Sequence, residues 1–336
     1  MLALKTKEPK TLSSISRRKE TEMKLKTSIV VTLFLVLAGL AKATENKTSY
    51  KFPYLFILGV GQDAGFPQAG CYKPHCLPAW KDPSLQRGAT SIALIDPVAK
   101  QKYLFEATPN LPSQLFDLEQ QAPDEEYELG GVFLTHAHIG HYAGLMFFGH
   151  EAMGASNIPV FAMPRMKSYL ESNGPWSQLV DYSNIRINEL KADKRINLNQ
   201  VNVKPFLVPH RDEFSETVGY EIKGPNKTAI FIPDIDKWEK WNTDLAELVK
   251  TVDYLLIDAT FFGDGELPGR DMSKIPHPLV TESMALLDKL SGQEKQKVWF
   301  IHFNHTNPLL NLESEEAKLV QEKGFNIARE GIVLAL

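Results

Sequence analysis

Short apolar runs alternate with amphipathic stretches along most of the chain, and turn-forming Gly, Pro, Asn and Asp residues separate them. Apolar runs bounded in this way are typical of buried strands. We expect strands over residues 54–60, 90–96, 102–107, 131–135, 158–162, 185–189, 201–209, 218–222, 228–232, 254–257, 298–302 and 331–336.

Apolar positions recur with helical spacing between several of these runs. This spacing predicts helices over residues 111–121, 164–172, 238–249, 279–290 and 314–323. Hairpins mixed with strand–helix–strand units favour an α/β fold in which two sheets pack together and helices cover their outer faces. Residues 261–276 form a long loop containing Gly and Pro, a length typical of active-site lids.

The first 51 residues differ in pattern from the rest of the chain. Residues 1–22 are polar, and we interpret them as an extension outside the fold, with Met23 as an alternative start. Residues 23–43 combine a basic start, an uncharged apolar run and a closing AKA, which is the pattern of a cleavable signal peptide. The apolar run is shorter than the roughly 20 residues of a membrane-spanning helix. We expect cleavage after Ala43, export to the periplasm or medium, a linker over 44–51 and a single domain over 52–336.

Composition limits the partners of this chain. Its 336 residues carry a formal net charge of -4, with 43% hydrophobic and 23% charged residues, close to the average globular protein. A chain without an excess of basic residues lacks the field that attracts nucleic acid or an anionic membrane. We therefore expect a small-molecule substrate, no nucleic-acid partner and no stable membrane anchor after cleavage. The oligomeric state stays open.

The chain has two cysteines, Cys71 and Cys76, in the phrase GCYKPHC. Two nearby cysteines in an exported protein favour a disulfide. The alternative is a small structural metal site that includes His75. Zinc sites of that kind use four ligands, and the local sequence offers no fourth one.

Three histidines follow the predicted strand 131–135: His136, His138 and His141, in THAHIGH. Imidazoles that turn toward one point as a strand ends are suitable ligands for zinc or iron. A His-rich surface loop is the alternative interpretation of this phrase.

Further strand ends carry the same residue types. His210 follows the predicted strand 201–209, Asp234 follows strand 228–232, and His302 ends strand 298–302, with His305 close behind. Ligands gather at strand ends in α/β proteins. The sequence therefore predicts one metal site assembled from several strands.

The order HxHxxH, His, Asp and His resembles the metallo-β-lactamase superfamily. The phrases GQDAGFPQAGC, LLIDATFF and FIHFNHTNP resemble, more narrowly, its pyrroloquinoline-quinone biosynthesis protein B branch. The resemblance implies an αββα sandwich of two mixed sheets with outer helices over residues 52–336. It also implies that His136, His138, His210 and Asp234 hold a first metal, and that His141, Asp234 and His302 are the ligands left for a second.

One position departs from the superfamily pattern. The usual motif is HxHxDH, and this chain has Gly140 where the Asp, a ligand of the second metal, would stand. We therefore expect one tightly bound zinc, with iron or a second metal as alternatives, and we expect Gly140→Asp to strengthen the second site. Asp236, Asp258 and His305 are candidate substitutes for the missing ligand.

The resemblance supports three functional hypotheses. The first is an exported metal-dependent hydrolase that cleaves an ester, lactone, lactam or related bond with metal-bound water. In it, Asp234 ligates the metal and orients the water, while His141 and His302 hold a second metal or act on the leaving group. The second is an iron-dependent oxidoreductase in cofactor biosynthesis, and the third is a binding protein without turnover.

Four other residues have open interpretations. Asp258 either orients a ligand histidine or caps a turn, and Asp63 contacts substrate or shapes its loop. Arg211 either binds an anionic substrate or forms a surface ion pair. His277, between prolines, is expected to be structural or exposed.

Overall fold

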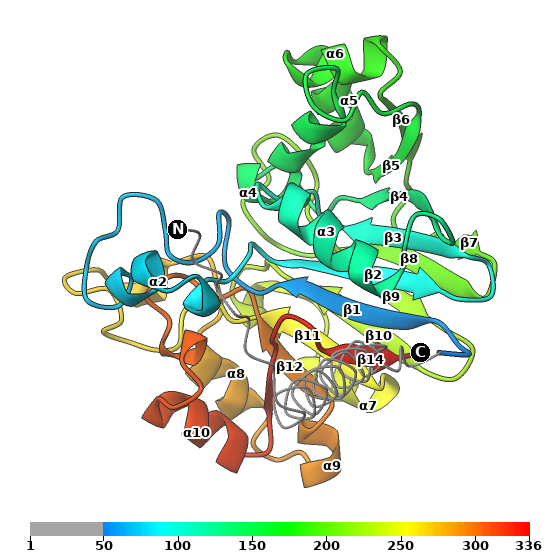
Figure 1. Cartoon of the computed structure of the whole chain (residues 1–336). Helices are drawn as coiled ribbons and strands as arrows, with labels where there is room; N and C mark the ends of the chain where they lie inside the picture. The colour runs from blue at the N-terminus through cyan, green and yellow to red at the C-terminus, as the bar shows by residue number, and fades with distance from the viewer. Residues whose placement is uncertain (1–49) are drawn as a thin grey trace, which may run out of the picture. The chain divides into compact units, whose positions relative to one another are not determined.

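Two mixed sheets of seven strands each face one another in the computed structural model, which describes residues 50–336 (Figure 1). In the first sheet, β3 to β6 run parallel, whereas β14, β1, β2 and β3 pair antiparallel. Its strands, in spatial order, are β14 (Val333–Ala335), β1 (Tyr54–Gly59), β2 (Ser91–Asp96), β3 (Gln101–Phe105), β4 (Glu128–Phe133), β5 (Ile158–Ala162) and β6 (Ile185–Glu189).

The second sheet has the complementary arrangement. Its strands β10 to β13 are parallel, and β7 to β10 pair antiparallel. In spatial order they are β13 (Asn326–Ile327), β12 (Val298–Ile301), β11 (Tyr254–Asp258), β10 (Thr228–Ile232), β9 (Val218–Lys223), β8 (Val201–Leu207) and β7 (Ile196–Leu198). Parallel neighbours end at the same edge of the sheet, which positions β10, β11 and β12 to deliver side chains to one place.

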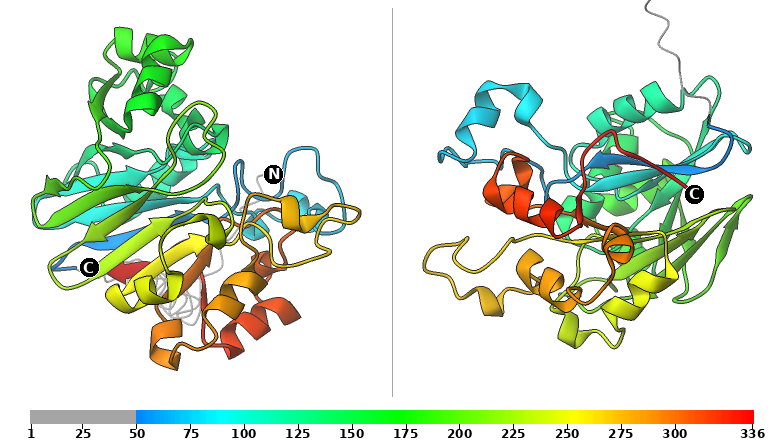
Figure 2. Two further views of the ribbon diagram at one scale, coloured as in Figure 1. Left: turned by 180° about the vertical axis from the view of Figure 1, so that it is seen from behind. Right: turned by 90° about the horizontal axis from the view of Figure 1, so that it is seen from below.

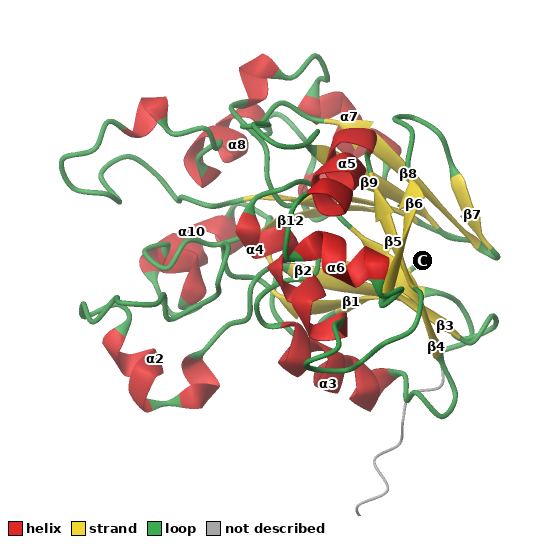
Figure 3. Ribbon diagram, turned by 90° about the horizontal axis from the view of Figure 1, so that it is seen from above, coloured by secondary structure: helices red, strands yellow, loops and turns green. Residues whose placement is uncertain are grey.

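Helices cover the outer faces of both sheets, as Figure 2 and Figure 3 show. Apolar side chains of α3, α5 and α6 pack on the first sheet, and those of α7, α8 and α10 pack on the side of the second. The α-helices are α2 (Leu77–Lys81), α3 (Leu111–Gln121), α4 (Ile139–Tyr142), α5 (Pro164–Ser172), α6 (Trp176–Asp181), α7 (Leu245–Thr251), α8 (Val280–Leu286), α9 (Gly292–Lys295) and α10 (Glu315–Glu322). The expected αββα sandwich is therefore confirmed.

Strand β1 shows why the apolar runs do not alternate between apolar and polar residues. Successive side chains of a strand point to opposite faces. Leu55 and Ile57 join the core between the sheets, while Tyr54, Phe56 and Leu58 join the core under the helices. Because both faces of the strand are covered, all six of its residues are buried.

Aromatic side chains fill the space between the sheets. The ring of Phe133 stacks on Phe105 and Phe161, with ring centroids 4.9 and 4.3 Å away, and meets the edge of Tyr220 from the facing sheet at 5.6 Å. Offset and edge-on aromatic contacts add to the free energy of burial. Phe133 is the last residue of β4, so this packing fixes the strand that leads into His136.

The structure corrects one predicted helix and the C-terminal end of another. Residues 238–249 are not one helix but a 3₁₀ turn, Trp238–Lys240, followed by α7. Asp244 causes the break, because its carboxylate accepts hydrogen bonds from the backbone N–H groups of Ala246 and Glu247 and so starts a new helix. The expected helix 279–290 is also shorter, ending at Leu286.

The loop over residues 261–276 is packed rather than open. It contains the 3₁₀ turn Met272–Lys274, and its apolar side chains form a small cluster of their own with Leu279. The carboxylate of Glu266 accepts hydrogen bonds from the backbone of Phe262 and the hydroxyl of Thr306, which ties the loop to the segment after β12.

The predictions for residues 1–49, including the signal peptide, lie outside the described residues. Residues 50–336 form one compact unit. Among their helices, we find none with the length and apolar character needed to cross a bilayer.

We predict that Phe133→Ala lowers the free energy of unfolding by about 3–5 kcal/mol, because it removes a fully buried ring and leaves a cavity between the sheets. Phe116→Ala, at a side chain 65% exposed on α3, should change it by less than about 0.5 kcal/mol. Chemical denaturation of both variants measures the difference. Equal effects would contradict the central position of Phe133.

Candidate metal centre

Five strand ends converge at one edge of the sandwich. The segment after β4 carries His136, His138 and His141, and the segments after β8, β10 and β12 carry His210, Asp234 and His302. Strand β11 ends in Asp258. All six residues named by the sequence pattern are thus brought together, as expected from strands that end at a common edge.

Four side chains form the first cluster: His136, His138, His210 and Asp234, whose potential ligand atoms all lie within 4.8 Å of one another. The Asp234 carboxylate lies 3.3 Å from His136 Nε2 through Oδ2 and 3.3 Å from His210 Nε2 through Oδ1. His138 Nδ1 is 3.3 Å from His210 Nε2. Three imidazoles and one carboxylate at such spacing suit a tetrahedral divalent metal.

A second cluster shares Asp234 with the first. It consists of His141, Asp234 and His302, again with potential ligand atoms within 4.8 Å of one another. His141 Nε2 lies 3.5 Å from Asp234 Oδ2. Asp234 therefore stands between the two clusters, and a single carboxylate serves both.

Three of the histidines, His136, His141 and His302, have a buried partner behind the ring. Thr135 Oγ1 lies 2.8 Å from His136 Nδ1, and Thr260 Oγ1 lies 2.9 Å from His302 Nδ1. Glu106, fully buried at the end of β3, places Oε1 3.6 Å from His141 Nδ1. Such partners fix the orientation of a ligand ring and leave its other nitrogen for the metal.

The pattern of unpaired atoms fits a metal. Buried polar atoms are nearly always hydrogen-bonded. Yet within residues 50–336 the Nε2 atoms of His136, His141 and His302 and the Oδ1 atom of Asp234 are buried without a hydrogen bond, and all face the two clusters. A divalent cation would satisfy these atoms together, so the residues present fit the metal that the motif implies.

The electrostatic environment favours the same interpretation. Burial lowers the pKa of His136 well below its usual value and also lowers the pKa values of His138, His210 and His302, so these rings stay neutral, as metal ligands must. Burial alone would raise the pKa of Asp234, but His210, His277 and His302 hold it well below its usual range. His141 is the exception: burial lowers its pKa, but Glu106 and Asp234 outweigh burial and raise the pKa of His141 well above its usual value, so this ring must lose a proton when it binds a metal.

Sequence reasoning missed His277. It is buried rather than exposed, and its Nδ1 lies 2.8 Å from Asp258 Oδ2 and 3.1 Å from Asp234 Oδ1. Burial lowers its pKa, but the two carboxylates outweigh burial and raise the pKa of His277 to about 10. The sequence feature that could have revealed it is a histidine on the long loop after β11, which returns toward the strand ends.

Asp258 combines the two roles considered for it. Its carboxylate accepts hydrogen bonds from the backbone N–H groups of Ile235 and Thr260, which fixes the loop that carries Asp234. It also pairs with His277 and lies 4.0 Å from His302 Nδ1.

Two suggested substitutes for the missing ligand lie elsewhere. Asp236 pairs with Lys240 at 2.7 Å. His305 belongs to a separate cluster near Cys71. Arg211 approaches His138 Nε2 at 3.4 Å and Glu213 at 3.9 Å from an exposed position, so it forms a loose ion pair at the surface.

The expectation that Asp fits at position 140 is wrong. A Cβ atom on Gly140 would lie 2.4 Å from Asp63 Cα and 2.7 Å from the Asp63 carbonyl oxygen. Atoms this close overlap, and the obstacle is backbone that cannot rotate away. Gly140→Asp would therefore displace the loop of Asp63 rather than complete a metal site.

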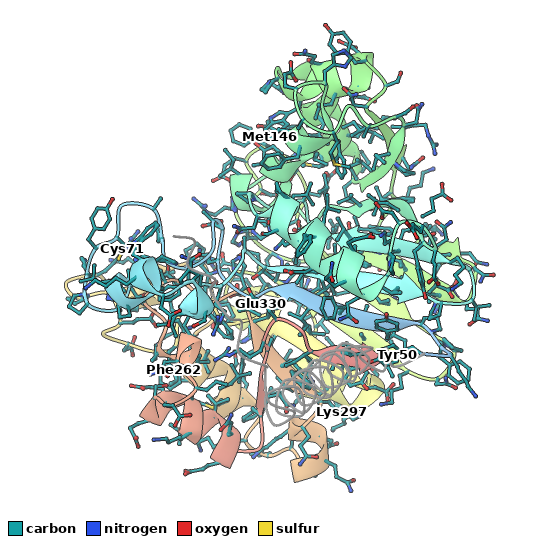
Figure 4. All side chains as sticks on the ribbon, in the orientation of Figure 1. Tyr50, Cys71, Met146, Phe262, Lys297 and Glu330 are labelled. Atoms are coloured by element: carbon teal, nitrogen blue, oxygen red, sulfur yellow. The ribbon has the colours of Figure 1, made fainter. Side chains whose placement is uncertain are left out.

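The expected disulfide is also contradicted, because Cys71 and Cys76 are both free thiols. They form a cluster with His75 and His305 in which the four potential ligand atoms lie within 4.8 Å of one another. Cys71 Sγ is 3.4 Å from His75 Nε2. His305, far away in sequence, is the fourth ligand that the alternative hypothesis lacked, and the set suits structural zinc. Figure 4 shows Cys71 on the segment that leads into α2.

Comparison with known proteins places this geometry in a family. The model of the beta-lactamase superfamily domain matches residues 94–303. Coenzyme PQQ synthesis protein B of Methylobacterium sp. is 25% identical over 83% of this chain and 99% of its own length. The corresponding protein of Gluconobacter oxydans is 23% identical over 84% and 98%.

Solved structures show the same fold. Zinc-bound PqqB from Methylobacterium extorquens superposes with a TM-score of 0.71 at 24% identity, covering 84% of this chain and all of that one. A diphosphatase of the PhnP family superposes with a TM-score of 0.59 at 19% identity, covering 85% of this chain and 99% of that one.

We predict that thiol titration of the denatured, unreduced protein finds two free thiols per chain. His305→Ala should release one equivalent of zinc and lower the melting temperature by more than about 4 °C, because a structural metal contributes directly to folding. His150→Ala, at an exposed histidine, is the matched control and should change neither quantity. A titration that finds no free thiol would show that Cys71 and Cys76 form a disulfide and would contradict this prediction.

Proposed function

This chain belongs to the beta-lactamase superfamily, and from that membership we propose that it is a PqqB-like metal-dependent oxidoreductase acting on a small molecule in the synthesis of a cofactor. The observation that carries the proposal is the pair of clusters that share Asp234. Alignment to coenzyme PQQ synthesis protein B over most of both chains supports the biosynthetic role.

The composition of the clusters supports redox chemistry. His141, Asp234 and His302 are two histidines and one carboxylate, the ligand set of non-haem iron enzymes that use dioxygen. When bound, iron supplies electron transfer to dioxygen, whereas zinc supplies a Lewis acid that lowers the pKa of water.

The chain's own residues contribute orientation and charge. Thr135, Thr260 and Glu106 hold the ligand rings, so the clusters keep their geometry when substrate enters. His277 carries a proton at Nδ1, between Asp258 and Asp234, and its charge helps to keep Asp234 ionised.

One observation favours hydrolysis as a second candidate. The first cluster offers three imidazoles and a carboxylate, a ligand set that suits zinc. In this interpretation the protein is an exported hydrolase of an ester, lactone, lactam or related bond. The identity of the bound metal separates the two candidates.

We predict that the protein reconstituted anaerobically with Fe²⁺ consumes dioxygen, and that His141→Ala and His302→Ala lose most of the iron in the second cluster and that reaction, whereas His136→Ala and His138→Ala lose the metal of the first cluster. Each variant deletes a ligand that no neighbouring side chain replaces. His150→Ala should match the wild type. Oxygen uptake and iron content after dialysis measure the effect.

Two results would overturn this assignment. Full metal retention in His138→Ala would contradict the site itself. Bound zinc with turnover of p-nitrophenyl esters or bis-p-nitrophenyl phosphate, and no oxygen uptake by the iron form, would favour the hydrolase.

We also propose export, on the pattern of residues 23–43. The mature protein isolated from its native source should begin at Thr44, which mass spectrometry of the amino-terminal peptide measures. Intact Met1 or Met23 in a cytosolic fraction would contradict export.

A further inference from the structure

The place of the missing ligand is filled by another part of the chain. Gly140 stands directly before His141, and a Cβ atom there would meet the Cα, C and O atoms of Asp63 at 2.4 to 2.8 Å. The backbone of Asp63 therefore lies where the side chain of a residue at position 140 would begin. A glycine is required at 140 because the loop of Asp63 passes this close.

The loop of Asp63 is fixed to the segment that carries His302. Gln62 N–H donates to the carbonyl of Phe303 at 2.8 Å, and Phe303 N–H donates to the carbonyl of Val60 at 2.8 Å. Thr90 secures the other side, because its N–H and hydroxyl both donate to the carbonyl of Gly61, at 2.7 and 2.9 Å. The backbone of Asp63 is thus held against Gly140, which precedes His141, and its neighbour Gln62 is bonded to Phe303, which follows His302.

The side chain of Asp63 is available. It is exposed, and among the described residues no hydrogen bond or ion pair engages its carboxylate. In this conformation the carboxylate lies outside the group of ligand atoms, within 4.8 Å of one another, that joins His141, Asp234 and His302. A carboxylate on an anchored backbone needs only side-chain rotation to change its position.

We propose that Asp63 is the carboxylate ligand that completes the second metal position beside His141, Asp234 and His302. The three protein ligands of this position leave room for a fourth. The first loop supplies the oxygen that the segment after β4 lacks. This inference rests on the proposed function only in requiring that the clusters bind metal, and it replaces the expectation of a single metal.

Metal stoichiometry tests the proposal without any activity assay. The wild type and Asp63→Asn, both stripped with chelator, are titrated with Zn²⁺ and analysed by calorimetry and elemental analysis. Asn is chosen because Asp63 has φ +47°, a left-handed conformation that Asn tolerates well. Asp63→Gly removes every side-chain oxygen and tolerates the same conformation.

We expect two equivalents in the histidine clusters of the wild type, besides any at the cysteine cluster, which cancels in the comparison. Both Asp63 variants should lose one equivalent or bind it at least about tenfold more weakly, and keep the other. Asp193→Asn is the matched control, since Asp193 is also exposed with a positive φ of 60° but lies between β6 and β7. It should bind as the wild type does.

Each other result overturns the proposal. Unchanged binding by Asp63→Asn and Asp63→Gly would show that Asp63 is not a ligand, and a single equivalent in the wild-type clusters would show that the second position does not fill. Both leave the proposed function standing. Absence of any metal in the clusters would instead refute the proposed function, and this inference with it.

Discussion

One buried carboxylate organises the edge of this sandwich. Asp234 lies between His136, His141, His210 and His277 and contacts each of them within 3.5 Å. Burying an ion without compensation costs several kcal/mol, at least about 3 when its partner is removed. The surrounding histidines keep the carboxylate of Asp234 ionised. The Nε2 atoms of His136, His141 and His302, which have no hydrogen bond, face the clusters around this carboxylate. Buried polar atoms without hydrogen bonds can lie this close together because a bound cation would satisfy them all.

The fold creates this arrangement through strand ends. β10, β11 and β12 are parallel neighbours, so Asp234, Asp258 and His302 emerge at one edge. β4 of the facing sheet brings its three histidines to the same edge, and Phe133, packed between the sheets, fixes the strand just before them. The two sheets thus contribute opposite halves of the site, and packing between them sets the distance across it.

The sequence was informative wherever local pattern decides structure. Strands buried on both faces are continuous apolar runs, and the helices 111–121 and 164–172 have the predicted bounds. The six ligand candidates could be found because they lie in the segments that follow apolar strands. The prediction of one helix over 238–249 was wrong because Asp244, a capping residue within the apolar pattern, starts a new helix.

Features that depend on distant segments could not be predicted in this way. His277 enters the site from a long loop, and His305 joins Cys71 across more than half of the chain. The meaning of Gly140 was hidden for the same reason, because only the folded chain brings the backbone of Asp63 against it. Sequence alone shows that a ligand is missing at 140, but not that another element occupies its place.

The central claim is that the buried cluster around Asp234 is a metal site. Anomalous X-ray diffraction from crystals of the protein as purified, recorded on both sides of the zinc and iron absorption edges, tests it most directly. The account predicts a strong peak enclosed by His136, His138, His210 and Asp234, at the edge that identifies the metal. No peak there from crystals soaked in either metal, with the imidazoles hydrogen-bonded to water or to one another, would contradict it.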